Sequence, residues 1–302
     1  MTQETNKTEK ATLYLVATPI GNLSDISPRA IKVLSECDFI AAEDTRNTRK
    51  LLTHFDIHKE LVSYHEHNKK EMGPKLCDRI EAGETCALVT DAGMPAISDP
   101  GEDIVRLCAK RHIAVSVITG CCAAVSALSL SALATGRFAF EGFLPAQKKE
   151  KEARLAKLKE EERTVILYEA PHRLKDTLSI LLRTFGEDRR ISLCRELTKR
   201  NEEVLRMTLG DATLYYEQNE PRGEYVLVLE GLLEAIENGT AEAPKKQSAD
   251  LPEQALSSPL KHIAYYEEKG MSHKDAIKAA ARDRDMSKSD FYALAVKERE
   301  SK

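Results

Sequence analysis

Short apolar runs alternate with amphipathic stretches from Ala11 to about Thr135, and this alternation limits the fold more than any other feature. The apolar runs expected to form strands span residues 11–18, 38–44, 60–67, 85–91 and 113–119. The amphipathic segments expected to form helices begin at Ser27, Thr45, Lys70, Asp99 and Cys121. Strands that alternate with helices predict an α/β fold, in which helices cover both faces of a mostly parallel sheet.

Two of these helices have clear start signals. Ser27 is a favourable N-cap residue, and Pro28 suits the first helical position because its φ angle is already helical. Asp99 and Glu102 have the spacing of a capping box, which satisfies free backbone N–H groups in the first turn. Both helices follow the ends of predicted strands, and open α/β sheets bind their ligands at that edge.

A second α/β region begins near Arg137. The segments that predict it are strands at 138–145, 164–171, 189–197 and 224–231, an apolar stretch at 202–209, and helices at 146–163 and 172–185. The expected organisation has four parts, which are an N-terminal α/β domain at 11–136, a second α/β domain at 137–233, a linker at 234–256 and a helical module at 257–302. The linker is rich in Ala, Pro, Lys and Ser and has little periodicity.

The C-terminal module is expected to contain three short helices. Ser258 precedes a proline, and two capping boxes begin at Ser272 and Ser287. Apolar side chains expected to share a small core are Ile263, Ile277, Ala280, Phe291 and Leu294. Ten Lys or Arg residues against eight Asp or Glu make this segment weakly basic, which favours a helix-turn-helix-like nucleic-acid module.

The composition narrows the class of protein. The formal net charge of −4 gives the whole chain no general attraction for polyanions, so any nucleic-acid contact requires local clusters of Lys and Arg. The seven cysteines include no C-x-x-C pair and lie mostly in apolar stretches, which is typical of reduced thiols in the cytosol. The sequence has no signal-peptide pattern and no apolar run of membrane-spanning length. We therefore expect a soluble, cytoplasmic protein.

Two loops after predicted strands are candidates for ligand contact. The first, at 18–25, contains Gly21, and the second, at 89–101, contains Asp91 and Gly93. Glycine lets the backbone approach a ligand closely, and a following helix N-terminus favours negative charge. Neither loop matches the glycine patterns of dinucleotide or ATP sites. A structural role, as a tight turn or a stiff connector, remains the alternative for both.

A third cluster follows the second predicted strand, where Glu43 and Asp44 precede Arg46, Arg49 and Lys50. Positive charge in the first turn of a helix opposes the helix dipole, so these cations are not there to stabilise the helix. One interpretation is an ion pair with Glu43 or Asp44. The other is a site for a phosphate-bearing substrate.

Histidines occur in two further motifs. His65 and His67 would face the same side of a strand, but no third and fourth ligand has a suitable spacing, so no metal site is expected. His172 lies with Glu169 and Arg173 at a strand end, where such residues often line a site. No arrangement indicates a serine or cysteine nucleophile.

The order of these motifs resembles the tetrapyrrole-methylase superfamily and, within it, the ribosomal RNA small-subunit methyltransferase I family. The motifs that carry the resemblance are TPIGNLSDIS, AEDTR, SYHEHN, TDAGMPAISDPG, EGFLP, YEAPHR, CREL and RGEYVLV, between Leu13 and Gly231. The resemblance implies two α/β domains with S-adenosylmethionine in the cleft between them. It also implies a homodimer that methylates the ribose 2′-hydroxyl of a cytidine in the decoding centre of 16S ribosomal RNA, without a metal.

The resemblance also assigns residues. The expected cofactor pocket contains Pro19, Gly21, Asp91, Ala92, Gly93, Ile97, Thr119, Gly120, Cys121, Cys122, Ala123, Leu144, Ala170, Arg222, Gly223 and Glu224. The expected substrate-binding residues are Asp44, Arg46, Arg49, His65, Asn68 and Arg173. Many relatives have Pro-Gly-Pro-Ser where this chain has 119–122, so a hydrogen bond from a serine is replaced here by a weakly donating thiol.

The expected reaction needs a general base, because a ribose hydroxyl is a poor nucleophile until its proton leaves. Asp25, Glu66 and His172 are the candidates, and the sequence does not rank them. Two other functions remain open at this point. One is methylation of a small tetrapyrrole, and the other is a non-catalytic RNA-binding assembly factor, which only the cysteines at 121 and 122 favour.

Overall fold

A computed structural model describes residues 8–242, 256–284 and 286–300. The chain divides into two compact units, residues 1–242 and 243–302. Most of the linker expected at 234–256 lies outside the described residues. No described helix combines the length and the apolar character that a membrane crossing requires.

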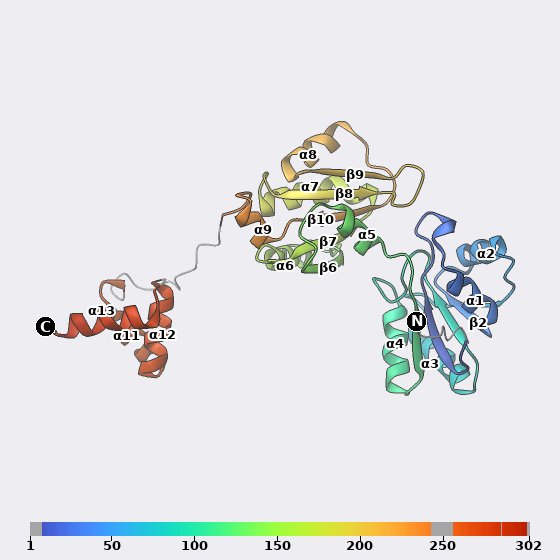
Figure 1. The fold of residues 1–302 in the computed structure, drawn as a ribbon, viewed down its shortest axis with the longest axis horizontal. Coiled ribbons are helices and arrows are strands. Elements are labelled where there is room, and N and C mark those ends of the chain that lie inside the picture. Colours follow the sequence, from blue (N-terminus) through green and yellow to red (C-terminus); the bar gives the residue numbers. More distant parts are fainter. Residues whose placement is uncertain (1–7, 243–255, 285, 301–302) are drawn as a thin grey trace, which may run out of the picture. The chain divides into compact units, whose positions relative to one another are not determined.

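The first sheet of the larger unit is entirely parallel, as the alternation predicts (Figure 1). Its strands are β1 (Thr12–Val16), β2 (Phe39–Ala42), β3 (Glu60–Ser63), β4 (Cys86–Val89) and β5 (Ala114–Ile118), in the order β3-β2-β4-β1-β5. The helices between them are α1 (Pro28–Glu36), α2 (Thr45–His54), α3 (Lys69–Glu81) and α4 (Gly101–Lys110).

Both faces of the central strands β2 and β4 are buried, and successive side chains of each strand point to opposite sides. In β2, Ile40 and Ala42 pack with α1 and α2, whereas Phe39 and Ala41 pack with α3 and α4. The cap predicted at Ser27 is confirmed, since its hydroxyl accepts a hydrogen bond from the N–H of Ala30. The capping box predicted at Asp99 and Glu102 is wrong, because Pro100 is the N-cap residue of α4 and Glu102 pairs with Arg106 one turn further on.

The helix expected from Cys121 is α5 (Ala123–Leu130), which packs on the second sheet rather than the first. Ala124, Ala127 and Leu128 form a buried cluster with residues of β7 and β10. The outer face of β5 therefore has no helix of its own over it, and Val115 and Val117 are 37% and 44% exposed.

The second sheet is mixed. Its strands are β6 (Phe138–Phe143), β7 (Thr164–Glu169), β8 (Arg190–Arg195), β9 (Glu203–Thr208) and β10 (Tyr225–Leu229), in the order β6-β7-β10-β8-β9. Only β6 and β7 are parallel, and every other neighbouring pair is antiparallel.

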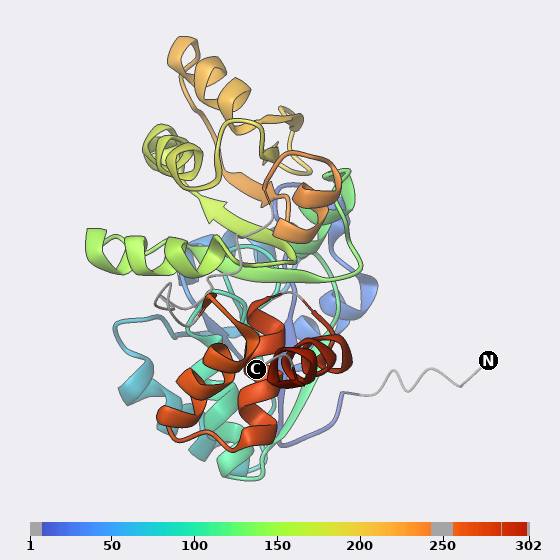
Figure 2. The same cartoon turned by 90° about the vertical axis from the view of Figure 1, so that its left-hand side faces the viewer.

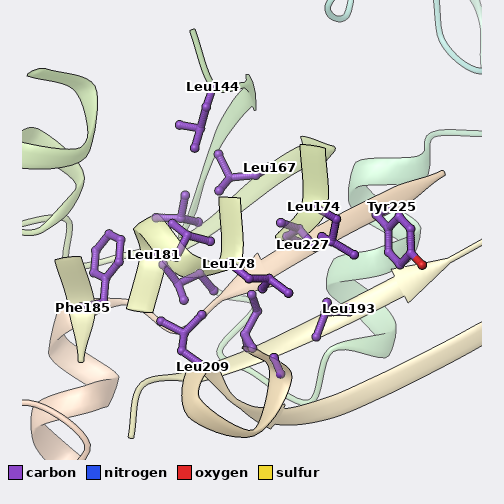
Figure 3. Packing of buried hydrophobic residues seen from close by; sticks show 14 of the residues in the cluster. Leu144, Leu167, Leu174, Leu178, Leu181, Phe185, Leu193, Leu209, Tyr225 and Leu227 are labelled. Atoms are coloured by element: carbon purple, nitrogen blue, oxygen red, sulfur yellow. The ribbon is translucent and has the colours of Figure 1, made fainter. Parts of the chain in front are cut away.

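Four helices accompany this sheet, namely α6 (Lys148–Leu158), α7 (Pro171–Phe185), α8 (Leu209–Gln218) and α9 (Leu232–Glu237). The leucines of α7 meet those of β7, β8 and β10 in a dense core (Figure 3). The sequence did not predict α8 or α9. In α8 the β-prone residues Thr213, Tyr215 and Tyr216 hide the helical pattern, although Thr208 caps the helix.

The described part of the smaller unit forms a bundle of three helices, drawn orange to red in Figure 2. They are α11 (Pro259–Glu268), α12 (His273–Asp283) and α13 (Lys288–Glu300), and Ser258 and Ser272 cap the first two as predicted. Four of the five expected core residues are buried, but Leu294 was predicted wrongly and is 44% exposed. Ala295 takes its place, since it lies one turn after Phe291 on the same helix face.

Candidate active site

A cavity of about 550 Å³ lies in the larger unit, between loops of the first sheet and strands of the second. Glu43 and Thr90 reach it from the carboxyl ends of β2 and β4, and Tyr168, Cys194 and Tyr225 reach it from β7, β8 and β10. This volume is typical of a small-molecule site. The strand ends of the first sheet are the expected position for such a site in an α/β fold.

The loop after β4 forms one wall of the cavity and is held rigidly. The N–H and carbonyl groups of Gly93 both bond to Thr18, at 3.0 and 2.9 Å. Ala96 and Ser98 adopt positive φ angles of 68° and 62°, and non-glycine residues rarely do so. The Asp99 carboxylate fixes this conformation, because Oδ1 accepts hydrogen bonds from the N–H groups of Ala96 and Gly101. Strain of this kind collects at ligand sites.

The opposite wall is a second strained loop, after β8. Glu196 and Thr198 have φ angles of 51° and 66°. The next residue, Lys199, donates hydrogen bonds from its ammonium group to the carboxylates of Glu196 at 2.8 Å and Glu224 at 2.7 Å. Burial lowers the pKa of Lys199, but the two carboxylates outweigh it, so the pKa is raised overall and the side chain is a cation.

The cavity is acidic. Five carboxylates line it against one ammonium group: Glu43, Asp91, Glu169, Glu196 and Glu224 against Lys199. Within the described part of the chain, Glu43 and Asp91 have no ion-pair partner, although Thr90 Oγ1 donates to Glu43 Oε2 at 2.7 Å and Asn47 donates to Asp91 at 3.3 Å. Burial, and secondly the charge of Glu43, raise the pKa of Asp91. Such a pocket favours a cationic ligand.

Half of the residues expected at the cofactor line this cavity. They are Asp91, Ala92, Gly93, Ile97, Cys122, Ala123, Ala170 and Glu224. The others lie outside its lining: Pro19, Gly21, Thr119, Gly120, Cys121, Leu144, Arg222 and Gly223.

Several residues outside the lining have structural contacts instead. Leu144 is part of the core of the second sheet. A Cβ atom on Gly120 would lie 2.8 Å from that of Ala17, and one on Gly223 would lie 2.4 Å from Cγ of Glu196. The Cys121 thiol points to the carbonyl of Asp25 at 3.7 Å, whereas Cys122 lines the cavity.

None of the three general-base candidates lines the cavity. Asp25 lies in an exposed one-turn helix, η1 (Leu23–Asp25). Glu66 forms an exposed ion pair with Lys69 at 2.8 Å. His172 is the second residue of α7, beside the lining residue Pro171.

The expected substrate residues also lie outside the cavity lining, and most have local partners. Arg46 pairs with Asp44 at 2.6 Å, and its hydrogen bonds hold the pKa of Asp44 well below the usual range. This is the ion pair that the sequence offered as one interpretation. Arg49 and the neighbouring Lys50 are exposed.

The loop after β3 differs from the strand expected there. His65 and His67 follow the last strand residue, Ser63, and their ring centroids are 5.9 Å apart. Asn68 uses both ends of its amide locally, accepting from the N–H of His65 at 2.8 Å and donating to the carbonyl of Ser63 at 3.0 Å. No group of three potential metal ligands was found among the described residues.

Arg173 contacts the end of β7 and the loop after β6. It donates to the carbonyl of Leu144 at 2.9 Å and lies 3.5 Å from the carboxylate of Glu169. Glu169 is 3% exposed and also accepts from the Thr177 hydroxyl at 2.6 Å. These contacts attach the residues after β6 to the start of α7.

Sequence reasoning missed several lining residues, notably Glu43, Lys199 and Tyr168. Glu43 had a visible signal, because it is the first polar residue after the buried run Phe39–Ala42. Lys199 had none, since only the turn after β8 brings it to the first sheet. Burial raises the pKa of Tyr168 to about 12, so its hydroxyl stays neutral in the cavity.

Comparison with known proteins explains this arrangement. The family model for Tetrapyrrole (Corrin/Porphyrin) Methylases matches residues 12–213. A protein of Halalkalibacterium halodurans named Ribosomal RNA small subunit methyltransferase I is 50% identical over 289 residues, which cover 95% of each chain. The chain belongs to the ribosomal RNA small subunit methyltransferase I family. It is therefore a methyltransferase of the tetrapyrrole-methylase superfamily.

Other members of the family are nearly as similar. The Bacillus subtilis protein of the same name is 43% identical, covering 95% of this chain and 94% of its own. The Synechocystis protein is 42% identical, with 94% and 97% covered.

Solved structures agree on the fold. Cobalt precorrin-4 methyltransferase has a TM-score of 0.55 at 17% identity, covering 73% of this chain and 95% of its own. Diphthine synthase has a TM-score of 0.56 at 15% identity, covering 73% and 90%. These likenesses confirm the two-sheet α/β architecture that the resemblance predicted.

Proposed function

We propose that this chain transfers the methyl group of S-adenosylmethionine to the ribose 2′-hydroxyl of a cytidine in the decoding centre of 16S ribosomal RNA. The observation that carries the proposal is a cavity of small-molecule size at the strand ends, in a chain half identical to a ribosomal RNA small subunit methyltransferase. A uroporphyrin-III C-methyltransferase of Thermus thermophilus with the same fold was solved with S-adenosyl homocysteine, which supports the choice of cofactor.

The cavity suits this cofactor chemically. S-adenosylmethionine, when bound, supplies a methyl group on a positively charged sulfur. Five lining carboxylates against one ammonium favour such a cation, and the apolar side chains of Ile97 and Val226 suit a flat base. We assign the cofactor contacts to the loop from Asp91 to Ile97, to Cys122 and Ala123, and to Ala170.

The same charge distribution disfavours methylation of a small tetrapyrrole with carboxylate side chains, because like charges in a partly buried cavity repel. The structural relatives named for tetrapyrrole substrates are 17–19% identical, so they do not assign a tetrapyrrole substrate to this chain.

We infer that Glu43 takes the proton of the ribose hydroxyl. It lines the cavity, has no ion-pair partner within the described ranges, and is held by Thr90 through Oε2, which leaves Oε1 for the substrate. Asp25, Glu66 and His172 lie outside the lining, and Glu66 shares the Lys69 ammonium with Asp103. A carboxylate within hydrogen-bond reach of the acceptor contributes about 10²- to 10⁴-fold to the rate.

The substrate phosphates must lie away from these carboxylates. We propose that Arg46 and Arg49, which are exposed at the start of α2, contact phosphates next to the target nucleotide. His65, with a buried ring nitrogen that has no hydrogen-bond partner in the described structure, is the remaining candidate for a substrate contact.

We further propose a cytoplasmic homodimer. The uncovered face of β5, with Val115 and Val117 partly exposed, is an apolar surface that a second copy would bury. All seven cysteines are free thiols, as expected in a reducing compartment.

Methyl transfer from labelled S-adenosylmethionine to small ribosomal subunits that lack the modification tests the function. Label in a 2′-O-methylcytidine of the decoding centre, located by nuclease mapping, is the expected result. Bound cofactor without transfer to the subunit would point to another acceptor, and no cofactor binding would favour a non-catalytic assembly factor.

A further inference from the structure

A groove of about 670 Å³ crosses the C-terminal unit between α12 and the start of α13. Its floor is apolar and contains Ala279, Ala281 and Met286. Residues of α12 and of the start of α13 form its walls, and these helices share a buried core.

The charged residues of this groove are mainly cations. Lys278, Arg282 and Lys288 line it, all three are exposed, and none has an ion-pair partner in the described part of the chain. Lys278 and Arg282 are one turn apart and so share one face of α12. The one described lining carboxylate is Asp275, and Ser272 donates a hydrogen bond to it at the start of the helix. The groove therefore has an excess of positive charge.

An exposed aromatic ring lies one helical turn beyond Lys288. Tyr292 is 51% exposed on α13, whereas its neighbour Phe291 is fully buried in the bundle core. Lys288 and Tyr292 share one face of the helix because they are four residues apart. Cations beside an exposed aromatic side chain are typical of surfaces that hold RNA, where bases stack on the ring and phosphates meet the cations.

The acidity of the active-site cavity favours a separate surface for the RNA backbone. Five carboxylates line that cavity against one ammonium, so it repels the phosphates of a polyanionic substrate. The affinity for a long RNA must then come from cations elsewhere on the chain. The three unpaired cations of the C-terminal groove can supply part of this affinity by binding phosphates.

We propose that the groove formed by Lys278, Arg282 and Lys288 binds the phosphate backbone of the RNA substrate, with Tyr292 stacking on an adjacent base. This inference rests on the proposed function, because it takes the substrate to be ribosomal RNA. An acidic protein of the ribosomal subunit is the competing partner, and the test separates the two.

The experiment compares full-length wild type with the double variant Lys278→Glu/Arg282→Glu. The matched control is Lys261→Glu/Lys269→Glu, which makes the same change of charge on α11 and at its C-cap, outside the groove. The probe is a fluorescent RNA oligonucleotide of the decoding-region sequence, and its dissociation constant is measured over a series of salt concentrations. Methyl transfer to small subunits is measured in parallel.

The groove variant is expected to bind the oligonucleotide about 10-fold more weakly. The slope of the logarithm of the binding constant against the logarithm of salt concentration should become shallower by roughly 0.7 to 0.9 for each lost phosphate contact. The control should retain wild-type values for both. Tyr292→Ala should weaken binding without changing the salt dependence, because stacking releases no counterions.

If RNA binding weakens equally in the groove variant and the control, the proposal is overturned, since binding would then depend on the net charge of the unit and not on the groove. Unchanged RNA binding with reduced methylation of the subunit would also overturn it, in favour of a protein partner. If wild type binds the oligonucleotide through the groove but methylates no subunit, the proposed function fails while the RNA-binding surface stands.

Discussion

The side chain of Lys199 lies directly over the backbone of Gly21. A Cβ atom at position 21 would be 2.3 Å from Cγ of Lys199 and 3.0 Å from the carbonyl oxygen of Leu197. Gly21 follows the first strand of one sheet and Lys199 follows β8 of the other, so this contact joins the two halves beside the cavity. The glycine of the first motif is therefore required by a neighbouring loop.

Gly21→Ala is expected to destabilise the larger unit by about 1–3 kcal/mol, the usual cost of overpacking. The Lys199 side chain can move, but the carbonyl of Leu197 belongs to a strained loop and cannot. Because Lys199 holds Glu196 and Glu224, affinity for S-adenosylmethionine should fall as well. Chemical denaturation and calorimetric titration measure the two effects.

Gly136→Ala is the matched control for this change. A Cβ atom at Gly136 would meet nothing within 4 Å, and the residue is exposed. Its stability and cofactor affinity should stay at wild-type values. Equal stability of the two variants would contradict the close contact at Gly21.

Glu43→Gln should lower kcat by about 10²- to 10⁴-fold, the usual contribution of a general base. The amide keeps the size of the side chain but cannot accept the proton. Thr90→Val, which removes the hydrogen bond to Oε2, should have a smaller effect, of about 10-fold. Single-turnover methyl transfer with saturating cofactor, at several pH values, is the measurement.

The kcat of Glu43→Gln is compared with that of three other variants, Asp25→Asn, Glu66→Gln and His172→Gln. Each should retain most of the wild-type kcat, because these side chains lie outside the cavity lining. Loss of the rate and its pH dependence in one of them, with Glu43→Gln active, would transfer the base role to that residue.

Arg173→Ala should cost about 1–3 kcal/mol of stability, because it removes the cation beside the buried Glu169 carboxylate and a hydrogen bond to the Leu144 carbonyl. Arg46→Ala should change stability by less than about 0.5 kcal/mol, since Arg46 is 85% exposed. Its effect should appear in KM for the ribosomal subunit. Denaturation curves and steady-state kinetics compare the two variants. A raised KM for the subunit with unchanged stability in Arg173→Ala, and not in Arg46→Ala, would make Arg173 the phosphate ligand.

The C-terminal unit should lose stability as the pH falls below about 6.5, the ordinary pKa of histidine. His262 is fully buried, and burial, then the charge of Arg284, lowers its pKa. Arg284 donates to Nδ1 at 3.1 Å, so the neutral ring donates from Nε2 to Asp283 at 3.3 Å. The unfolded chain binds a proton that the folded unit does not, and protonation favours unfolding.

Hydrogen-exchange protection of α11 and α12 at about pH 7.5 and about pH 5.5 measures this effect. Protection should fall at the lower pH in wild type. In His262→Gln, which does not titrate, that part of the pH dependence should be absent. Constant protection in wild type across this range would contradict the neutral buried ring.

Local patterns in the sequence determined much of the fold. The strands of both sheets were predictable because buried runs such as Phe39–Ala42 and Tyr225–Leu229 are short, apolar and bounded by polar residues. Helix starts at Ser27, Ser258 and Ser272 were predictable because capping depends on neighbours three residues away. Helix α8 was not, since its tyrosines favour a strand and only packing on the second sheet makes it helical.

The motifs of the chain were sufficient to identify its family and to place half of the expected cofactor residues on one cavity. The role of Gly21 was decided by tertiary structure, because the partner that demands a glycine lies far along the chain at Lys199. The same holds for Glu43, which borders a cavity that exists only when two sheets meet. Sequence patterns report contacts between near neighbours, whereas this cavity is built from side chains that only the folded chain brings together.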